Sequence, residues 1–361
     1  MVDYIILPGT ILKEYLNERK ITQKELAEKL NFSEKHISNI INGKSGITEE
    51  IALNLEKIFP DVKAEFWLDL ERDYKLNILR AKERKKALEG LDLLTLSKEY
   101  EFDYLFKGLN YTLEEKANET LKILGVDSFQ KANEMATNNQ ALFFHDGGNP
   151  KAQLVWLKLC EFEFDIQNEI SQIKPFDLNK LKGSMEIFKK IIYTTDFDFM
   201  ISNIRKFLNH LGIGFVLMDA VPTSKIRGAT TVIEGIPAIF MTSRYKKLDS
   251  FYFTLIHEIH HLLSEDLKKP GYQNILYEDD VRELKSNGFA QNFLINLENY
   301  ERFLEKDSIS DLDIITFANN EGVIPDIIVG FLERTMDKKY GKPIYGKFQH
   351  LRTKLTSKGG S

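Results

Sequence analysis

The sequence predicts a multidomain protein with an all-α helix-turn-helix domain, then a helical middle region, then an α+β domain. Two short helices with capping residues lie within residues 22–43, and period-two strands lie within residues 213–241. A histidine-rich helix follows the last strand. We expect domain boundaries at residues 1–75, 76–190 and 191–340, with a basic tail at 341–361.

Composition narrows the class of protein. The 361 residues are 43% hydrophobic, enough for more than one core. Lys and Arg number 49 against 54 Asp and Glu, a net charge of −5, so no global positive field marks a nucleic-acid or membrane protein. The single cysteine, Cys160, excludes an internal disulfide framework. With no signal pattern at residues 1–20 and no run of about 18 apolar residues, we expect a cytoplasmic protein without a membrane partner.

The first predicted helix pair carries strong local signals. Thr22 and Glu25 form a capping box, and Ser33 is placed to cap the next helix after a three-residue turn. Asn42-Gly43 indicates a left-handed end to that helix. One helix beginning at Pro8 and another capped by Thr48 complete a predicted helix-turn-helix.

In this motif the second helix enters the major groove of DNA. The predicted base-contacting residues are Glu34, Lys35, His36 and Asn39, and the predicted phosphate-contacting residues are Gln23, Asn42 and Lys44. Specific binding needs two half-sites, so a homodimer on double-stranded operator DNA is expected. The alternative is that these residues are the solvated faces of a small helical bundle. Residues 1–80 hold 12 basic and 14 acidic residues, so phosphate binding would need a local stripe of Lys13, Arg19, Lys20, Lys24, Lys35 and Lys44.

The segment resembles the Xre/HigA family of DNA-binding antitoxin-type regulators. The resemblance lies in Thr22-Gln23-x-x-Leu26-Ala27, in Asn42-Gly43 and in the later Phe66-Trp67-Leu68. It implies transcription regulation in a toxin-antitoxin or related system.

Residues 75–190 are predicted to be helical and contain no recognisable set of catalytic residues. Thr112 and Glu115 form a second capping box in this region. Residues 145–150 are predicted as a loop, in which His145 is a turn residue rather than a ligand. Strands are then predicted at 213–218, 228–233 and 237–241, with Glu234-Gly235 as a hairpin turn. The edge of such a sheet can hold an extended peptide by strand addition.

The stretch His257-Glu258-Ile259-His260-His261 reads H-E-x-x-H. Two histidines four residues apart lie on one helix face, about 6 Å apart along its axis, and can bind one tetrahedral ion. Glu258 could accept a proton from water at that ion. His260 points about 100° away from His261 and is excluded as a ligand. Asp249 is placed to cap this helix.

A catalytic zinc usually has three protein ligands, so a third ligand is expected downstream. We predict Glu283 as this ligand and Asn287, one turn later, as the group that orients a liganding imidazole. Glu278, Asp279 and Asp280 are the alternatives to Glu283.

The stretch from about residue 150 to 350 resembles the ImmA/IrrE family of zinc metallopeptidases. The resemblance lies in 244–255, which lead into the H-E-x-x-H segment, in Glu283-x-x-x-Asn287 with Phe289-Ala290, in Phe317-Ala318 and in 322–330. It implies a gluzincin-like fold with Zn2+ as cofactor, His257, His261 and Glu283 as ligands and Glu258 as general base. His260, Asn296 and Ile324 depart from the family pattern, and Tyr245 and Tyr277 are weaker candidates for stabilising an oxyanion.

The two resemblances together imply a transcriptional regulator with a zinc metalloendopeptidase domain. Its expected substrate is a protein partner, such as a repressor or toxin, or the chain itself, in stress, phage or toxin-antitoxin control. The alternative is a non-proteolytic antitoxin-like repressor whose C-terminal domain is a sensor or protein-binding module.

Overall fold

The computed structural model describes residues 6–137, 142–145, 147–170, 173–191, 196–243, 247–266, 281–340 and 346–353. Contacts divide the chain into two compact units, Met1–Leu93 with Thr112–Glu119 and Leu94–Tyr111 with Thr120–Ser361. The domain boundaries predicted from the sequence stay predictions. Within the described ranges, no helix has both the length and the apolar character needed to cross a membrane.

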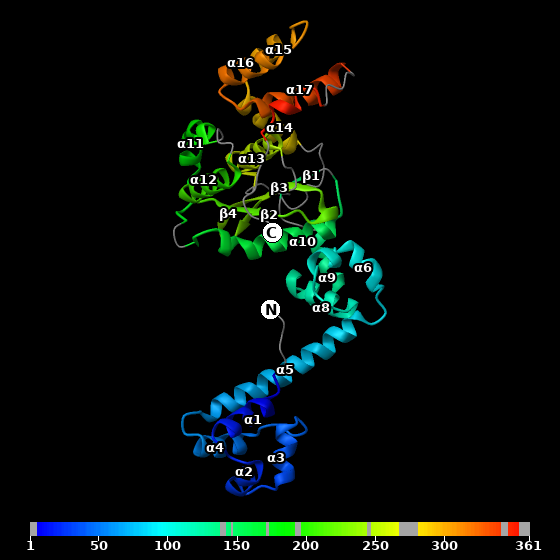
Figure 1. Ribbon diagram of the computed structural model, residues 1–361, viewed down its shortest axis with the longest axis vertical. Coiled ribbons are helices and arrows are strands. Elements are labelled where there is room, and N and C mark those ends of the chain that lie inside the picture. Colours follow the sequence, from blue (N-terminus) through cyan, green and yellow to red (C-terminus); the bar gives the residue numbers. More distant parts are fainter. Residues whose placement is uncertain are drawn as a thin grey trace. The chain divides into compact units, whose positions relative to one another are not determined.

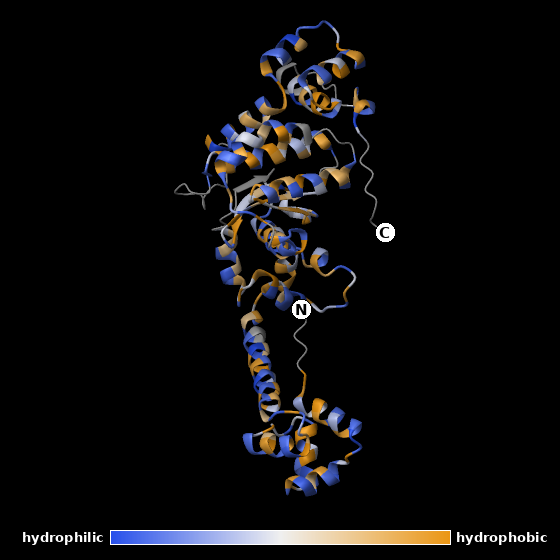
Figure 2. Cartoon of the chain, turned by 90° about the vertical axis from the view of Figure 1, so that its left-hand side faces the viewer, coloured by the Kyte–Doolittle hydropathy of each residue, from blue (hydrophilic) through white to orange (hydrophobic). Residues whose placement is uncertain are grey.

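The N-terminal unit is all-α, as predicted. Its helices are α1 (Pro8–Glu18), α2 (Gln23–Leu30), α3 (Glu34–Ile41), α4 (Glu49–Ile58) and α5 (Ala64–Leu88). Each of α1 to α4 buries one face and exposes the other, which Figure 2 shows as alternating hydrophobic and hydrophilic residues. The buried faces meet around Leu26, Ile37, Leu55 and Trp67.

The predicted caps are confirmed in this unit. Thr22 and Glu25 form the reciprocal capping box of α2, and the Ser33 hydroxyl accepts the His36 N–H at 3.2 Å to cap α3. Thr48 caps α4 in the same way. The turn between α2 and α3 places Asn31 in the left-handed region at φ 57°, and Gly43 ends α3 at φ 69°.

The second unit combines helices with one small sheet. The remaining described helices are α6 (Leu93–Glu99), α7 (Phe102–Leu105), α8 (Leu113–Leu124), α9 (Phe129–Thr137), α10 (Pro150–Gln167), α11 (Leu178–Ile191), α12 (Phe197–His210), α13 (Leu248–Leu263), α14 (Val281–Leu294), α15 (Leu297–Leu304), α16 (Asp311–Glu321) and α17 (Pro325–Tyr340). Helix α8 is shared, because its residues up to Glu119 belong to the first unit. Two short 3₁₀ turns, η2 (Pro222–Ser224) and η5 (Gln349–Leu351), are also present. The predicted capping box of Thr112 and Glu115 is confirmed before α8.

The sheet has the strand order β1-β3-β4-β2. The three predicted strands are confirmed as β2 (Gly214–Met218), β3 (Ile226–Ile233) and β4 (Ile236–Thr242). Strands β3 and β4 pair antiparallel, while β2 and β4 pair parallel. The predicted hairpin turn is confirmed, because Glu234 and Gly235 both have positive φ, 49° and 85°.

A fourth strand was missed. Strand β1 (Leu142–His145) pairs antiparallel with β3, with His145 opposite Ile226. The prediction that the loop begins at His145 is therefore wrong. Four residues carry too little periodicity to identify a strand, and this one is stabilised by pairing with residues more than 80 positions away.

Helices cover both faces of the sheet. Helix α10 packs on β2, and α13 packs on β3 and β4 from the opposite side (Figure 1). The outer edge of β2 is also covered, because the Gln167 side chain bonds both the N–H and the C=O of Leu217, at 3.1 and 3.0 Å. Asn168 accepts the N–H of Phe215 at 2.9 Å. Amide side chains therefore replace a neighbouring strand along β2.

Helix α13 begins differently from the prediction. Its N-cap is Lys247, so the prediction that Asp249 caps the helix is wrong. Asp249 lies in the first turn, 5% exposed, where its carboxylate accepts from Arg352 and from Arg334. Arg352 also donates to Glu333 at 2.9 Å. Two arginines from later in the chain outcompete the helix N–H groups for this carboxylate, because each can form a charge-assisted bond.

Candidate metal centre and nucleic-acid interface

His257 and His261 lie on one face of α13, the helix that packs on β3 and β4. Both side chains are buried, at 0% exposure. Their Nε2 atoms face each other at 3.1 Å. The four-residue spacing that predicted a shared site therefore brings the two ring nitrogens to one point.

Glu283 reaches the same point from α14, which packs along α13. Its Oε2 lies 3.0 Å from His257 Nε2, and its Oε1 lies 3.3 Å from His261 Nε2. The ligand atoms of His257, His261 and Glu283 all lie within 4.8 Å of one another. The alternative ligands Glu278, Asp279 and Asp280, and the candidate Tyr245 and Tyr277, lie outside the described residues.

The far nitrogen of each imidazole has an oxygen partner. His257 Nδ1 lies 3.0 Å from Asn287 Oδ1, and His261 Nδ1 lies 3.0 Å from Asp266 Oδ2. An oxygen without a proton can only accept here, so each Nδ1 carries the hydrogen and each Nε2 presents its lone pair. Sequence reasoning predicted Asn287 for this position but missed Asp266, which is 1% exposed just beyond the end of α13.

Two lone pairs and a carboxylate then point at one buried spot. This arrangement is repulsive unless a proton or a cation lies between the atoms. Two imidazole nitrogens and one carboxylate oxygen are also the ligand set of many catalytic zinc sites. The residues present therefore fit a zinc ion.

The pKa values of His257, His261 and Glu283, called the trio below, are set by burial and by these contacts. Burial lowers the pKa of His257. Burial also opposes protonation of His261, yet its bonds to Asp266 and Glu283 raise its pKa to about 9. Burial acts against ionisation of Glu283, but the two histidines lower its pKa to about 2. Without a metal, a proton on His261 facing an ionised Glu283 would relieve the repulsion.

Glu258 lies beside the trio and is fully buried. Thr230 of β3 donates to its Oε2 at 2.7 Å, while Oε1 has no hydrogen-bond partner among the described residues. Gly228 makes room for this carboxyl group, because a Cβ there would lie 2.8 Å from Oε1. Burial raises the pKa of Glu258 to about 8, so the group can hold or release a proton near neutral pH.

His260, which was excluded as a ligand, joins α13 to α14. Its Nδ1 lies 2.8 Å from Ser286 Oγ, and its ring packs on Phe289 with centroids 4.7 Å apart. Ser286 Oγ also lies 3.5 Å from His261 Nδ1. The contact therefore holds together the two helices that carry the trio.

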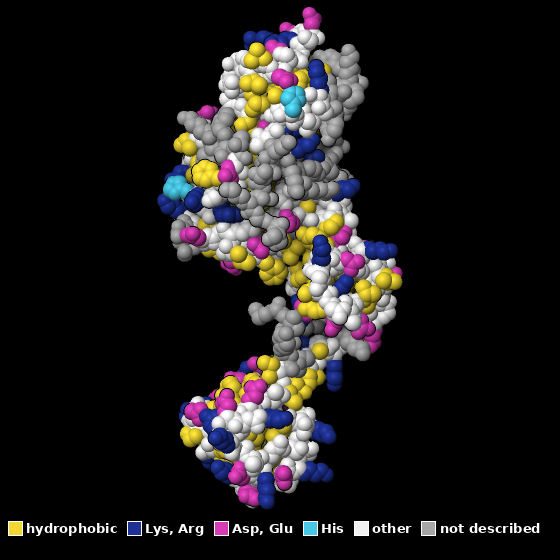
Figure 3. Space-filling view, viewed as in Figure 1, with side chains coloured by type: hydrophobic (Ala, Val, Ile, Leu, Met, Phe, Trp, Pro, Cys, Tyr) yellow, Lys and Arg dark blue, Asp and Glu magenta, His cyan; other side chains and the backbone are white. Residues whose placement is uncertain are grey.

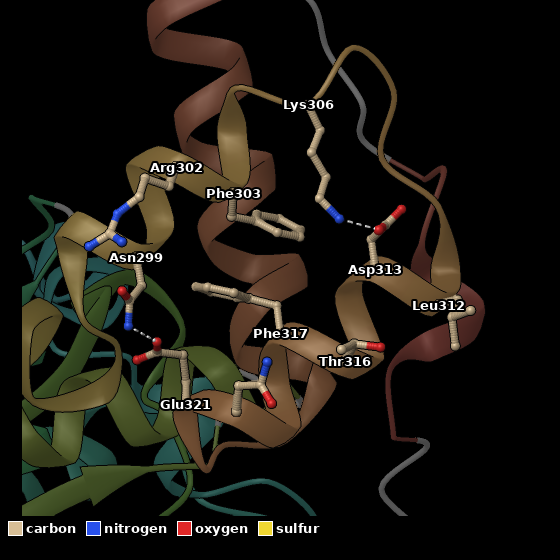
Figure 4. A pocket seen from close by; sticks show the side chains of 10 residues that line it. Asn299, Arg302, Phe303, Lys306, Leu312, Asp313, Thr316, Phe317 and Glu321 are labelled. Atoms are coloured by element: carbon tan, nitrogen blue, oxygen red, sulfur yellow. Dashed lines mark hydrogen bonds and ion pairs between the residues drawn. The ribbon is translucent and has the colours of Figure 1, made fainter.

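A groove lies between α15 and α16 (Figure 4). It has a volume of about 510 Å³, and its floor is the stacked pair Phe303 and Phe317. Lys306 pairs with Asp313, and Asn299 bonds Glu321 at 2.7 Å. Four of the polar side chains that line the groove are therefore engaged with one another.

The predicted DNA-contacting residues all lie at the start of α2, on α3 or just after it. Glu34, Lys35 and Lys44 are exposed, whereas Gln23, His36 and Asn39 are half-buried. The His36 ring packs on Phe32 with centroids 4.9 Å apart. Asn42 is exposed, but its amide donates to the Ser38 carbonyl at 2.8 Å, so its side chain is partly engaged within α3.

One member of the predicted basic stripe has another role. Arg19 forms an ion pair with Asp61, and its guanidinium lies over the rings of Tyr15 and Phe59 at 5.1 and 5.0 Å. Lys13, Lys20, Lys24 and Lys35 are exposed. Figure 3 shows both signs of charge on the visible face of the N-terminal unit. Any phosphate-binding surface is therefore local.

Comparison with known proteins bears on the N-terminal part. The family model described as helix-turn-helix matches residues 12–67. Virulence-associated protein A of Dichelobacter nodosus is 41% identical over 71 residues, which are 19% of this chain and 70% of that protein. An uncharacterized helix-turn-helix-type transcriptional regulator of Escherichia coli, YbaQ, is 40% identical over 65 residues, 18% of this chain and 57% of that protein.

Solved structures show the same similarity. An addiction module antidote protein of the HigA family from Coxiella burnetii is 34% identical, with 24% of this chain and 94% of that chain covered and a TM-score of 0.22. The antitoxin HigA of Pseudomonas aeruginosa, solved with the higBA promoter, is 32% identical, with 24% and 95% covered and a TM-score of 0.22. The family match ends at residue 67, so the role of the metal centre rests on its geometry.

Proposed function

Because this chain belongs to the helix-turn-helix family of DNA-binding, antitoxin-like transcriptional regulators, we propose that it joins operator binding to a zinc-dependent endopeptidase. The observation that carries the peptidase is the convergence of His257, His261 and Glu283 on one buried point with Glu258 beside it. A site that only stabilised the fold would not need a buried carboxyl group next to its ligands.

His257, His261 and Glu283 would hold the ion, and Asn287 and Asp266 would keep the imidazole lone pairs directed at it. A zinc ion held by these residues would polarise a peptide carbonyl and make a bound water more acidic. Glu258 accepts the proton of the attacking water and returns it to the leaving amine. Glu258 must be ionised to accept this proton, and a cation held beside it would lower its raised pKa toward the ionised state.

The sheet favours an extended peptide as the substrate. Gln167 and Asn168 cover the outer edge of β2, so among the described residues β1 is the edge left for strand addition. Strand β1 pairs with β3, the strand whose Thr230 contacts Glu258. A flexible segment of a repressor, of a toxin or of this chain would fit that edge.

The N-terminal unit is proposed to read operator DNA with α3, using Glu34, Lys35, His36 and Asn39. Gln23, Asn42 and Lys44 would contact phosphates, and a homodimer would present two such helices to two half-sites. The HigA neighbour solved with its promoter is consistent with DNA as the partner.

The first experiment is elemental analysis of the purified full-length protein. We expect about one zinc per chain in the wild type and loss of the metal in His261→Ala. The matched control is His210→Ala, which removes an exposed histidine from the end of α12 and should keep the metal. A wild type that binds no zinc on titration would instead favour the non-proteolytic repressor, with a sensor or binding module at its C-terminus.

The second experiment separates binding from catalysis. Glu258→Gln should retain zinc but lose cleavage by at least about a hundredfold, the usual contribution of a general base. New protein N-termini in cells would be compared between wild type and variant by mass spectrometry. Equal cleavage products in both strains would exclude the peptidase.

A further inference from the structure

A buried carboxylate in the N-terminal unit has no part in the site described so far. Glu71 of α5 is 7% exposed. Its Oε2 accepts the backbone N–H of Ile47 at 3.0 Å, and its Oε1 lies 3.3 Å from Lys75 Nζ. A carboxylate removed from water is destabilising unless it is hydrogen-bonded or paired, so these contacts fix where Glu71 can lie.

Gly46 makes this approach possible. A Cβ at Gly46 would lie 2.3 Å from Glu71 Oε1, closer than any side chain allows. The carboxylate therefore reaches directly into the turn between α3 and α4. Gly46 does not have a positive φ, so the backbone conformation does not require glycine at this position. What requires glycine is the close approach of the Glu71 carboxylate.

The same turn is held at its other end by α3. The N–H groups of Lys44 and Ser45 both donate to the Asn39 carbonyl, at 2.8 and 3.2 Å. Lys44 is exposed. It therefore lies in a turn that is fixed at one end by the Asn39 carbonyl of α3 and at the other by the Glu71 carboxylate of α5. Trp67, one turn before Glu71 on α5, is fully buried, so the second anchor is itself held by the core.

We propose that Glu71 is a positioning residue for DNA binding. It holds the turn after α3 so that Lys44 can contact a DNA phosphate. The inference rests on the DNA-binding function and is independent of the metal centre. Helix α5 runs on to Leu88, so the Glu71 contact also ties the turn to the segment that leads out of the helix-turn-helix.

The test uses the full-length protein and a labelled duplex of about 30 base pairs, selected from a random library by the wild type. Binding is measured by fluorescence anisotropy at several salt concentrations. Glu71→Ala should weaken binding about tenfold and make the salt dependence shallower by about one phosphate contact, as should Lys44→Ala. Glu71→Gln should bind at least as tightly as the wild type, because the amide oxygen still accepts the Ile47 N–H and one negative charge is removed.

Two further variants distinguish a positioning role of Glu71 from a simple effect of its charge. Removing a negative charge alone should tighten DNA binding, as the control Glu65→Ala on the exposed side of α5 is expected to show. The double variant Glu71→Ala/Lys44→Ala should be no weaker than the weaker single variant, because both lose the same contact.

Several results would overturn the proposal. One is a folded Glu71→Ala variant, checked by circular dichroism, with the salt dependence of the wild type. Another is additive losses in the double variant, which would make Glu71 structural only. If the wild type binds no duplex at all, the DNA-binding function itself fails and this inference fails with it.

Discussion

The N-terminal unit and the metal centre are assembled in different ways. Thr22 with Glu25 and Ser33 with His36 are contacts between residues three positions apart. The metal centre joins α13 to α14 and β3, with Thr230 and Glu258 lying 28 positions apart. A module built from local contacts is therefore sensitive to its caps, whereas the centre is sensitive to long-range pairs and to the ion.

This contrast predicts which of the two units bound zinc stabilises. Removing zinc with a chelator should lower the unfolding midpoint of the second unit and leave the first unit unchanged. At free zinc about a thousand times its Kd, the lost stabilisation is about 4 kcal/mol. Differential scanning calorimetry with and without chelator measures the difference. Equal shifts in both units, or no shift, would contradict the assignment.

Long-range ion pairs should produce the next largest effect. Arg352 is 7% exposed and joins Asp249 at the start of α13 to Glu333 on α17. Arg352→Ala removes this partner from the buried Asp249 and the half-buried Glu333 and should lower the free energy of unfolding of the second unit by about 3 kcal/mol.

The matched control is Arg302→Ala, since the Arg302 side chain is 70% exposed and lies 4.0 Å from Glu298. That variant should change stability by less than about 1 kcal/mol. Urea titrations of the two variants compare them directly. Equal losses would mean that the Arg352 network contributes no more than a surface pair.

Local caps should have smaller effects, confined to the first unit. Ser33→Ala removes the acceptor for the His36 N–H and should cost about 1 kcal/mol. Thermal unfolding followed by circular dichroism measures this loss, and zinc content should not change. Thr10→Ala, at an exposed position of α1, is the control. A Ser33 variant that loses zinc would show that the two units depend on each other.

The smallest effect concerns a cap in the second unit and depends on pH. Lys306 and Ser310 hold the pKa of Asp313 well below its usual 3.8. A lowered carboxyl pKa contributes stability above the unfolded-state value, which is lost as pH falls toward the folded-state value. Asp313→Asn should therefore unfold earlier than the wild type at pH 7, and the gap should close below pH 3.8. A gap that widens in acid would contradict this sign.

Sequence reasoning predicted most of the first unit because its signals are local. Thr22, Ser33 and Thr48 cap helices that begin where predicted, and Gly43 ends α3. It failed where a distant partner decides. Strand β1 has too few residues to show a period, and Asp249 is paired with arginines some 80 to 100 positions later.

The sequence by itself determined the capped helices, three of the four strands and the pairing of His257 with His261, since helical geometry places residues four apart on one face. Only the tertiary structure decided how closely Glu283 approaches them, that Asp266 holds His261, and that Glu258 is buried against Thr230. The reason is that burial, and with it the pKa of Glu258, depends on how α13, α14 and β3 pack. No local pattern encodes that packing.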